Sequence, residues 1–148
     1  VGSEMCIRDR APDLLRAVLL PLADRSVDIG SLVTPIADAH EAATESFVKC
    51  ACAFLGEAEV APALYFSRTA IPWGAGPLWH HIGVYAYRRA ALARFVSLPP
   101  SQLELREKLE QLRALEDGMR IAVARVPHGP FGVDTPEDLA RARDILKD

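Results

Sequence analysis

The sequence predicts an α/β domain with a mixed, mainly parallel sheet and helices packed against it. Segments with the two-residue period of strands alternate along the chain with segments that have the 3.6-residue period of helices. Half of the 148 residues are hydrophobic and a quarter are charged, which is enough apolar material for one buried core. Alternating helices and strands of this kind are typical of layered α/β structures.

The first ten residues, VGSEMCIRDR, differ from the rest of the chain in composition and periodicity. They lack the apolar run that a signal peptide needs. They resemble a translated sequencing adapter, so we interpret residues 1–10 as a non-native or artefactual leader. The fold is therefore expected to cover residues 11–148.

The first half of the domain is predicted from apolar spacing and turn residues. Leu14, Val18 and Leu22 have helical spacing, and Pro12 suits the first turn of a helix. Alternating or β-branched runs then predict strands. In chain order, the elements are a helix over 12–22, a strand over 29–36, a short helix over 37–44, and strands over 47–54 and 63–67.

The second half begins with the loop IPWGAGP, which its Pro and Gly content predicts. Ser101 can serve as the N-cap of a long helix, and Gly118 can end it. Thr135 can cap a last helix, with Pro136 at its first position. In chain order, the elements are a strand over 81–88, a helix over 90–96, a helix from Ser101 to about Glu116, a strand over 119–126 and the helix after Thr135.

Charge and cysteine content exclude several classes of protein. The formal net charge is -3 with both signs well mixed, so the chain has no basic stripe for nucleic acid and no polybasic membrane signal. The three cysteines lack the spacing of a zinc site and are too few for a disulfide framework. We expect a cytoplasmic protein that binds neither nucleic acid nor membranes.

Asp134 is a candidate ligand-binding residue because the predicted helix start at Thr135 does not need it. It lies one residue before the cap, after a Pro- and Gly-rich segment that follows the strand over 119–126. Open α/β sheets place ligand-binding residues at such junctions between a strand and a helix.

The predicted strand HIGVYAYR has one apolar face and one face of hydrogen-bonding side chains. Alternation places His81, Tyr85 and Tyr87 on one face and Ile82 and Val84 on the other. The polar face can belong to a binding site. The alternation alone favours the alternative, the half-exposed face of an antiparallel strand whose histidine is satisfied by hydrogen bonds.

The predicted helix after Ser101 has an equally ambiguous polar face. Leu105, Leu109 and Leu112 form its expected buried stripe, and Glu110 and Gln111 lie on an adjacent face. A charged helix face is usually just solvated. A neighbouring Glu and Gln can instead bind sugar hydroxyls, because together they offer donors and acceptors.

Arg68 ends the predicted strand ALYFSR. It can be a simple surface charge. Alternatively, its planar guanidinium can pair with an anionic ligand.

Four motifs in register resemble the 3-deoxy-manno-octulosonate cytidylyltransferase (CMP-Kdo synthetase) family. They are ALYFSRTAIPW, HHIGVYAYRRAAL, KLEQLRALEDGMRI and GVDTPEDLARAR, and the resemblance extends from Ala11 to Ile145. It implies a partial nucleotide-diphospho-sugar transferase-like three-layer α/β/α fold. It also implies a homodimeric, magnesium-dependent enzyme that makes CMP-3-deoxy-manno-octulosonate and diphosphate from CTP and the acid sugar, for lipopolysaccharide biosynthesis.

The resemblance also implies roles for individual residues. Asp134 matches a catalytic aspartate of the family that binds Mg²⁺, a hard cation that prefers carboxylate oxygens. His81, Tyr85, Glu110 and Gln111 match positions that contact the acid sugar, and Arg68 matches the arginine after the YFS strand. One departure is ATESFVKC, where the family has an Asn-Pro-Asn turn before a Val-Lys pair. Val48 and Lys49 are retained, but no ligand contact is carried over from that turn.

Two segments of the family do not occur in these 148 residues. One is the Gly-rich loop that holds the CTP phosphates, and the other is a Gln-Gly-Asp-Glu-Pro segment with a second metal-binding aspartate. We therefore interpret the chain as a C-terminal sugar-binding and dimerisation part of the enzyme, inactive alone and without the N-terminal phosphate-binding part. The alternatives are a non-catalytic oligomerisation or sugar-binding module, or a cytidylyltransferase for a related acid sugar such as neuraminate.

Overall fold

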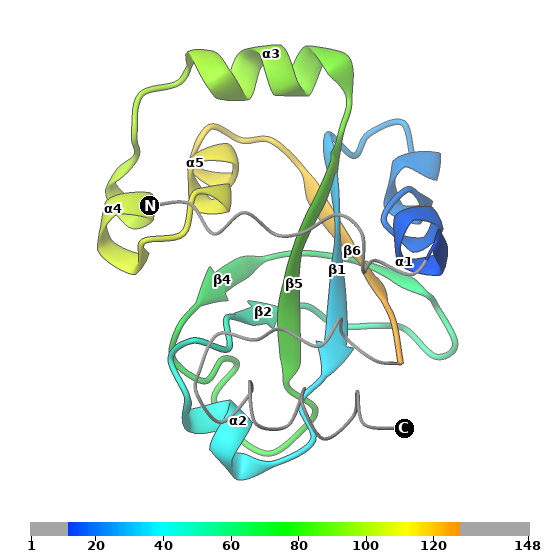
Figure 1. The fold of residues 1–148 in the computed structure, drawn as a ribbon, viewed down its shortest axis with the longest axis vertical. Coiled ribbons are helices and arrows are strands. Elements are labelled where there is room, and N and C mark those ends of the chain that lie inside the picture. Colours follow the sequence, from blue (N-terminus) through cyan, green and yellow to red (C-terminus); the bar gives the residue numbers. More distant parts are fainter. Residues whose placement is uncertain (1–11, 128–148) are drawn as a thin grey trace, which may run out of the picture.

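A six-stranded mixed sheet forms the centre of the structure, a computed structural model that describes residues 12–127 (Figure 1). Its spatial order is β3-β6-β1-β5-β2-β4. Strands β2 and β4 run across the direction of β1 and β5 in Figure 1, as expected for a strongly twisted sheet. The strands are β1 (Ile29–Pro35), β2 (Lys49–Ala51), β3 (Val60–Pro62), β4 (Tyr65–Ser67), β5 (Trp79–Tyr87) and β6 (Ile121–Arg125).

The pairing of these strands corrects one expectation. Among the described strands, β1 and β6 are the one parallel pair, and the other four pairs are antiparallel. The sheet is mixed, as expected, but "mainly parallel" is wrong for this part of the chain. Parallel neighbours need long crossover connections, usually helical. Between β2 and β5 the chain forms no helix, so it turns back on itself and pairs antiparallel.

Helices pack on both faces of the sheet. On one face, α1 (Pro12–Ala17) covers a cluster around Leu32 and Ile82. On the other face, α3 (Arg89–Ser97), α4 (Gln102–Glu107) and α5 (Gln111–Glu116) cover a larger cluster around Phe66 and Val33. The 3-10 helix η2 (Leu20–Ala23) follows α1, and α2 (Ala39–Ala43) follows β1. This arrangement agrees with the expected α/β/α layers.

The strand predicted over 47–54 is shorter than expected, and one strand was not predicted. Strand β2 contains three residues, and the chain beyond Phe54 forms β3 at the edge of the sheet. Strand β3 is also three residues long and includes Pro62, which has no backbone N–H for a ladder. So short a segment with a proline gives too weak a periodic signal to be recognised in the sequence.

The single helix predicted after Ser101 is two helices. Lys108 adopts a left-handed conformation with φ of 57°, which ends α4 and redirects the chain into α5. Helical spacing across this residue is broken. Leu109 and Leu112 are therefore buried as expected, whereas Leu105 is 66% exposed and does not belong to the buried stripe.

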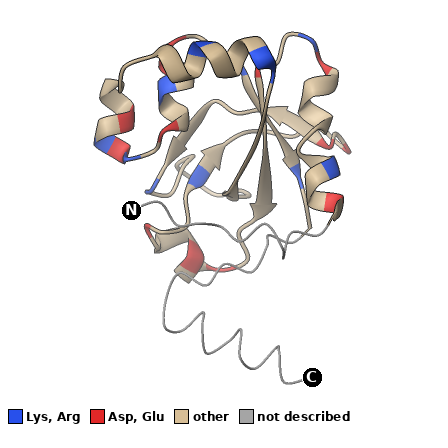
Figure 2. Ribbon diagram, turned by 45° about the horizontal axis from the view of Figure 1, so that its top comes forward, with Lys and Arg blue, Asp and Glu red and all other residues tan. Residues whose placement is uncertain are grey.

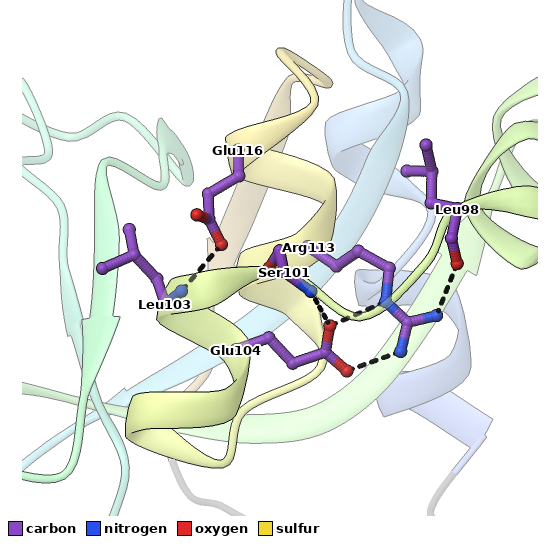
Figure 3. A network of polar contacts seen from close by, with 6 residues as sticks. All are labelled: Leu98, Ser101, Leu103, Glu104, Arg113 and Glu116. Atoms are coloured by element: carbon purple, nitrogen blue, oxygen red, sulfur yellow. Dashed lines mark hydrogen bonds and ion pairs between the residues drawn. The ribbon is translucent and has the colours of Figure 1, made fainter.

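An ion pair between Glu104 and Arg113 joins α4 to α5 (Figure 3). Arg113 donates from Nε to Glu104 Oε2 at 2.8 Å and from its terminal nitrogens to Glu104 Oε1 and to the Leu98 carbonyl. Glu104 also accepts from the backbone N–H of Ser101 at 2.9 Å, which confirms that the helix begins there. The hydrogen bond from Arg113 lowers the pKa of Glu104. Breaking a buried pair of this kind typically costs about 3–5 kcal/mol.

Acidic and basic residues are interspersed over the helices, and the strands carry few charges (Figure 2). This agrees with the mixed charge pattern of the sequence. Within residues 12–127, every helix is too short or too polar to cross a bilayer.

Lys108→Gly is expected to raise the free energy of unfolding by about 1 kcal/mol. In the left-handed region a Cβ atom comes too close to the backbone carbonyl oxygen, and glycine has no Cβ. Urea unfolding measures this as a higher midpoint at an unchanged slope. Lys108→Ala is the matched control, since it removes the same charge but keeps the Cβ. Equal stability of the two variants would contradict the explanation.

Candidate functional site

A row of rings lies along the face of β5 that looks toward α5. The His81 ring centroid is 4.7 Å from that of Phe66 and 5.5 Å from that of Tyr85, and Tyr85 and Tyr87 are 6.0 Å apart. Ile82 and Val84 belong to the buried cluster on the opposite face. The alternation predicted for this strand is confirmed, and both of its faces are packed.

The ladder between β1 and β5 is irregular beside His81. Gly30 pairs with Ala86 and Leu32 pairs with Ile82, so three residues of β5 face the single residue Ser31. Two extra residues preserve the two-residue alternation, which is why Tyr85 remains on the same face as His81. Bulges of this kind are frequent next to active sites, where they redirect side chains.

Ser31 and His81 are both buried and bonded to each other. The Ser31 Oγ lies 2.8 Å from His81 Nε2 and 2.8 Å from the Val84 carbonyl oxygen. Burial lowers the pKa of His81 to about 3, with a smaller contribution from His80. His81 is therefore a neutral imidazole at neutral pH, with one donor and one acceptor nitrogen.

Two further candidates lie at the start of α5. Glu110 is the N-cap of α5 and is exposed, and Gln111 is the first residue of the helix and is buried. The pKa of Tyr85 is raised, chiefly by burial and further by Tyr87 and the Glu110 carboxylate. His81, Tyr85 and Glu110 are thus neighbours at β5 and the start of α5, and Gln111 follows Glu110 in the chain.

Arg68 lies beside this neighbourhood, but its bonds are structural. Its Nε donates to the Glu107 carbonyl at 2.9 Å, and its terminal nitrogens donate to the carbonyls of Glu45 and Lys108. Its own backbone N–H donates to the Glu107 carboxylate at 3.2 Å. Arg68 therefore joins β4 to the turn between α4 and α5, and two of its five N–H groups are left for a ligand.

Lys49 holds the turn that departs from the family pattern. Its Nζ is fully buried and donates to the carbonyls of Thr44 at 2.7 Å and Arg68 at 2.8 Å. Burial lowers its pKa. The sequence showed that Lys49 is retained but not that its ammonium is buried.

A separate hollow of about 410 Å³ opens at the carboxyl ends of β1 and β6. Phe54, Trp79 and the loop around Pro72 form apolar walls, and Arg125 lies over the Phe54 ring. None of the sugar-contact candidates lines it. The two features are therefore distinct places in the described part of the fold.

Asp134 lies outside the described residues, so its prediction as a metal ligand and catalytic residue remains a prediction. Within residues 12–127, no three His, Cys, Asp or Glu side chains gather in a group that could hold a metal ion. The described part of the chain therefore does not by itself fit a magnesium site.

Sequence reasoning missed Ser31, Glu104 and Arg113. Alternation along SLVTPI places the Ser31 hydroxyl on the same side of the sheet as His81, but only the strand pairing reveals the contact. Glu104 has capping-box spacing from Ser101, whereas its pairing with Arg113 depends on the break at Lys108.

The comparisons with known proteins agree with the four sequence motifs. A family model described as cytidylyltransferase matches residues 9–121. The 3-deoxy-manno-octulosonate cytidylyltransferase of Methylobacterium radiotolerans is 59% identical over 136 residues, which cover 92% of this chain and 55% of the relative. That of Rhodopseudomonas palustris strain BisB18 is 58% identical, covering 91% of this chain and 55% of the relative. The chain thus spans about half the length of these relatives.

A solved structure gives the same result for the fold. CMP:2-keto-3-deoxy-manno-octonic acid synthetase complexed with CTP matches with a TM-score of 0.78 and 33% identity, covering 94% of this chain and 57% of that chain. The resemblance predicted from the sequence motifs is confirmed by all three comparisons. The chain belongs to the cytidylyltransferase family.

Proposed function

We propose that this chain carries the acid-sugar site of a 3-deoxy-manno-octulosonate cytidylyltransferase. The observation that supports this most is that Tyr85 lies 5.5 Å from His81, ring to ring, and has its pKa raised by burial and in part by the Glu110 carboxylate at the start of α5, next to the buried Gln111. These four residues come from two separate motifs of the family, and relatives of that name are 58–59% identical to the chain.

In the proposed reaction, the anomeric hydroxyl of the sugar attacks the α-phosphate of CTP. A new bond forms between that oxygen and the α-phosphorus, the bond to the β-phosphate oxygen breaks, and diphosphate leaves. The hydroxyl loses its proton to solvent or a base. Holding the two reactants in line contributes much of the rate in reactions of this type.

The described residues would bind and orient the sugar. Neutral His81, whose Nε2 is bonded to Ser31, has its other ring nitrogen left for the sugar, and the Tyr85 hydroxyl, whose pKa is raised, offers a proton. The Glu110 carboxylate accepts hydrogen bonds, and the Gln111 amide both donates and accepts. A polyhydroxylated ligand needs such a mixture of partners.

Further parts of the proposal rest on the family resemblance. Asp134 would bind Mg²⁺, which neutralises phosphate charge when present. The enzyme would be a cytoplasmic homodimer whose product serves lipopolysaccharide biosynthesis. The 148 residues alone would bind the sugar without making the product, because the two phosphate- and metal-binding segments of the family are not among them.

A hybrid enzyme tests the proposed function directly. In it, this chain replaces the matching part of the Methylobacterium radiotolerans relative, of which it covers 55%. We expect the hybrid to convert CTP and 3-deoxy-manno-octulosonate to the CMP-sugar, measured by mass spectrometry, and to prefer this sugar to neuraminate. A folded hybrid that makes no product, or that prefers neuraminate, would overturn the proposal.

Asp134→Asn in the hybrid is expected to lower kcat by at least about 100-fold at saturating magnesium, since a lost metal ligand removes charge stabilisation of the transition state. Glu137→Gln, which removes a neighbouring carboxylate, is the matched control and should remain active. Near-normal turnover of the Asp134 variant would exclude this residue from the metal site.

Because the pKa of His81 is lowered in the folded protein, the free energy of unfolding is expected to depend on pH. Its pKa is about 3 in the folded protein and 6.5 as the unperturbed value, so below pH 6.5 the unfolded state takes up a proton that the folded state does not. The contribution of neutral His81 to the free energy of unfolding is fully present above pH 6.5. It falls by about 1.4 kcal/mol per pH unit as the pH decreases toward 3.

Between pH ~7 and pH ~5, wild type should therefore lose about 2 kcal/mol more than His81→Gln, as measured by urea unfolding. His40→Gln, at an exposed position of α2, is the matched control. The same pH dependence in wild type and His81→Gln would show that His81 is not held neutral by burial.

A further inference from the structure

The hydroxyl of Ser31 lies among three possible hydrogen-bond partners. Its Oγ is 2.8 Å from the Val84 carbonyl oxygen, 3.3 Å from the Ile82 carbonyl oxygen and 2.8 Å from His81 Nε2. Ser31 is fully buried and His81 nearly so. A buried polar group without a hydrogen bond lowers the stability of the fold. Each short contact of Ser31 Oγ should therefore be a hydrogen bond, with one proton between the two atoms.

The proton count fixes the direction of each bond. A serine hydroxyl has one proton, and a carbonyl oxygen can only accept. If the Ser31 proton pointed at His81, two acceptor oxygens of Ser31 and Val84 would face each other at 2.8 Å with no proton between them. If it points at Val84, the Ser31 oxygen can accept from His81, and both short contacts become hydrogen bonds.

This arrangement specifies the tautomer of His81. The nitrogen that faces Ser31 must carry the proton, and a histidine with a pKa of about 3 has only one at neutral pH. Nδ1 is then the unprotonated nitrogen and can accept a hydrogen bond. Within residues 12–127, no hydrogen bond to Nδ1 is found.

We propose that Ser31 is a positioning residue that holds His81 as the Nε2–H tautomer, so that Nδ1 accepts a hydrogen bond from a hydroxyl of the bound sugar. The bulge in β5 makes this possible, because it leaves the carbonyls of Ile82 and Val84 turned toward a single β1 residue. Ser31 itself does not touch the sugar. The role of Nδ1 rests on the proposed function, whereas the tautomer does not.

NMR of the ¹⁵N-histidine-labelled 148-residue chain tests the tautomer without any reaction. We expect Nε2 of His81 at the chemical shift of a protonated nitrogen and Nδ1 at that of an unprotonated one. Ser31→Ala should produce a mixture of tautomers, and Ser31→Thr, which keeps the hydroxyl, should restore the wild-type pattern. Ser67→Ala, which removes a buried hydroxyl that bonds elsewhere, is the matched control. A protonated Nδ1 in wild type would overturn the proposal, as would an unchanged pattern in Ser31→Ala.

Kinetics of the hybrid enzyme test the consequence for the sugar. Ser31→Ala should raise the KM for 3-deoxy-manno-octulosonate about tenfold and leave the KM for CTP within about twofold, as is usual when an orienting partner is lost. A general loss of structure would instead lower kcat and change both KM values. Equal KM values for the sugar in wild type and Ser31→Ala would contradict the role of Nδ1. A wild-type hybrid without activity would refute the proposed function and leave the tautomer to the NMR result.

Discussion

The pairing of β1 with β5 is the constraint on which the candidate site depends. β5 is packed between two helical layers, so each of its side chains has a fixed face, and a shift by one residue would exchange them all. The ladder nevertheless accommodates three β5 residues opposite Ser31. β5 has two more residues than β1 in this stretch, and an even number of extra residues keeps the alternation of side chains. His81 and Tyr85 therefore remain on the same face of the sheet. The bulge thus turns the carbonyls of Ile82 and Val84 toward Ser31 without disturbing the alternation that packs the core.

The second half of the site depends on a break in a helix. Lys108 ends α4 in a left-handed conformation, and α5 begins at Gln111 with Glu110 as its N-cap, whose carboxylate adds to the effect of burial in raising the pKa of Tyr85. An uninterrupted helix would have placed Gln111 on the same stripe as residues of α4. The bidentate pair of Arg113 with Glu104, and the Arg113 guanidinium 5.0 Å over the Phe95 ring, hold α5 against α3 and α4 after this break. Local strain at one residue is thereby compensated by an interaction that spans three helices.

Several features of the fold follow from the sequence because they are local. The periodicity of HIGVYAYR, the Ser101 cap and the Gly118 stop each depend on a few neighbouring residues, and all agree with the structure. The motifs also identified the family correctly. Strand direction, the edge strand β3 and the break at Lys108 depend on contacts between distant segments. For the same reason, the sequence could nominate His81 as a ligand contact but could not reveal Ser31 as its partner, fifty residues away.

Two cations, Lys49 and Arg68, hold the turn that departs from the family pattern. Lys49 and Arg68 donate to the carbonyls of two consecutive residues at the start of the turn, Thr44 and Glu45, and so hold it through its backbone. Carbonyl partners satisfy the donors but do not neutralise the charge. Within the described residues, neither cation forms an ion pair with a carboxylate. Two carboxylates nevertheless lie nearby, because Glu45 opposes the lowering of the Lys49 pKa by burial and Glu107 accepts from the backbone N–H of Arg68.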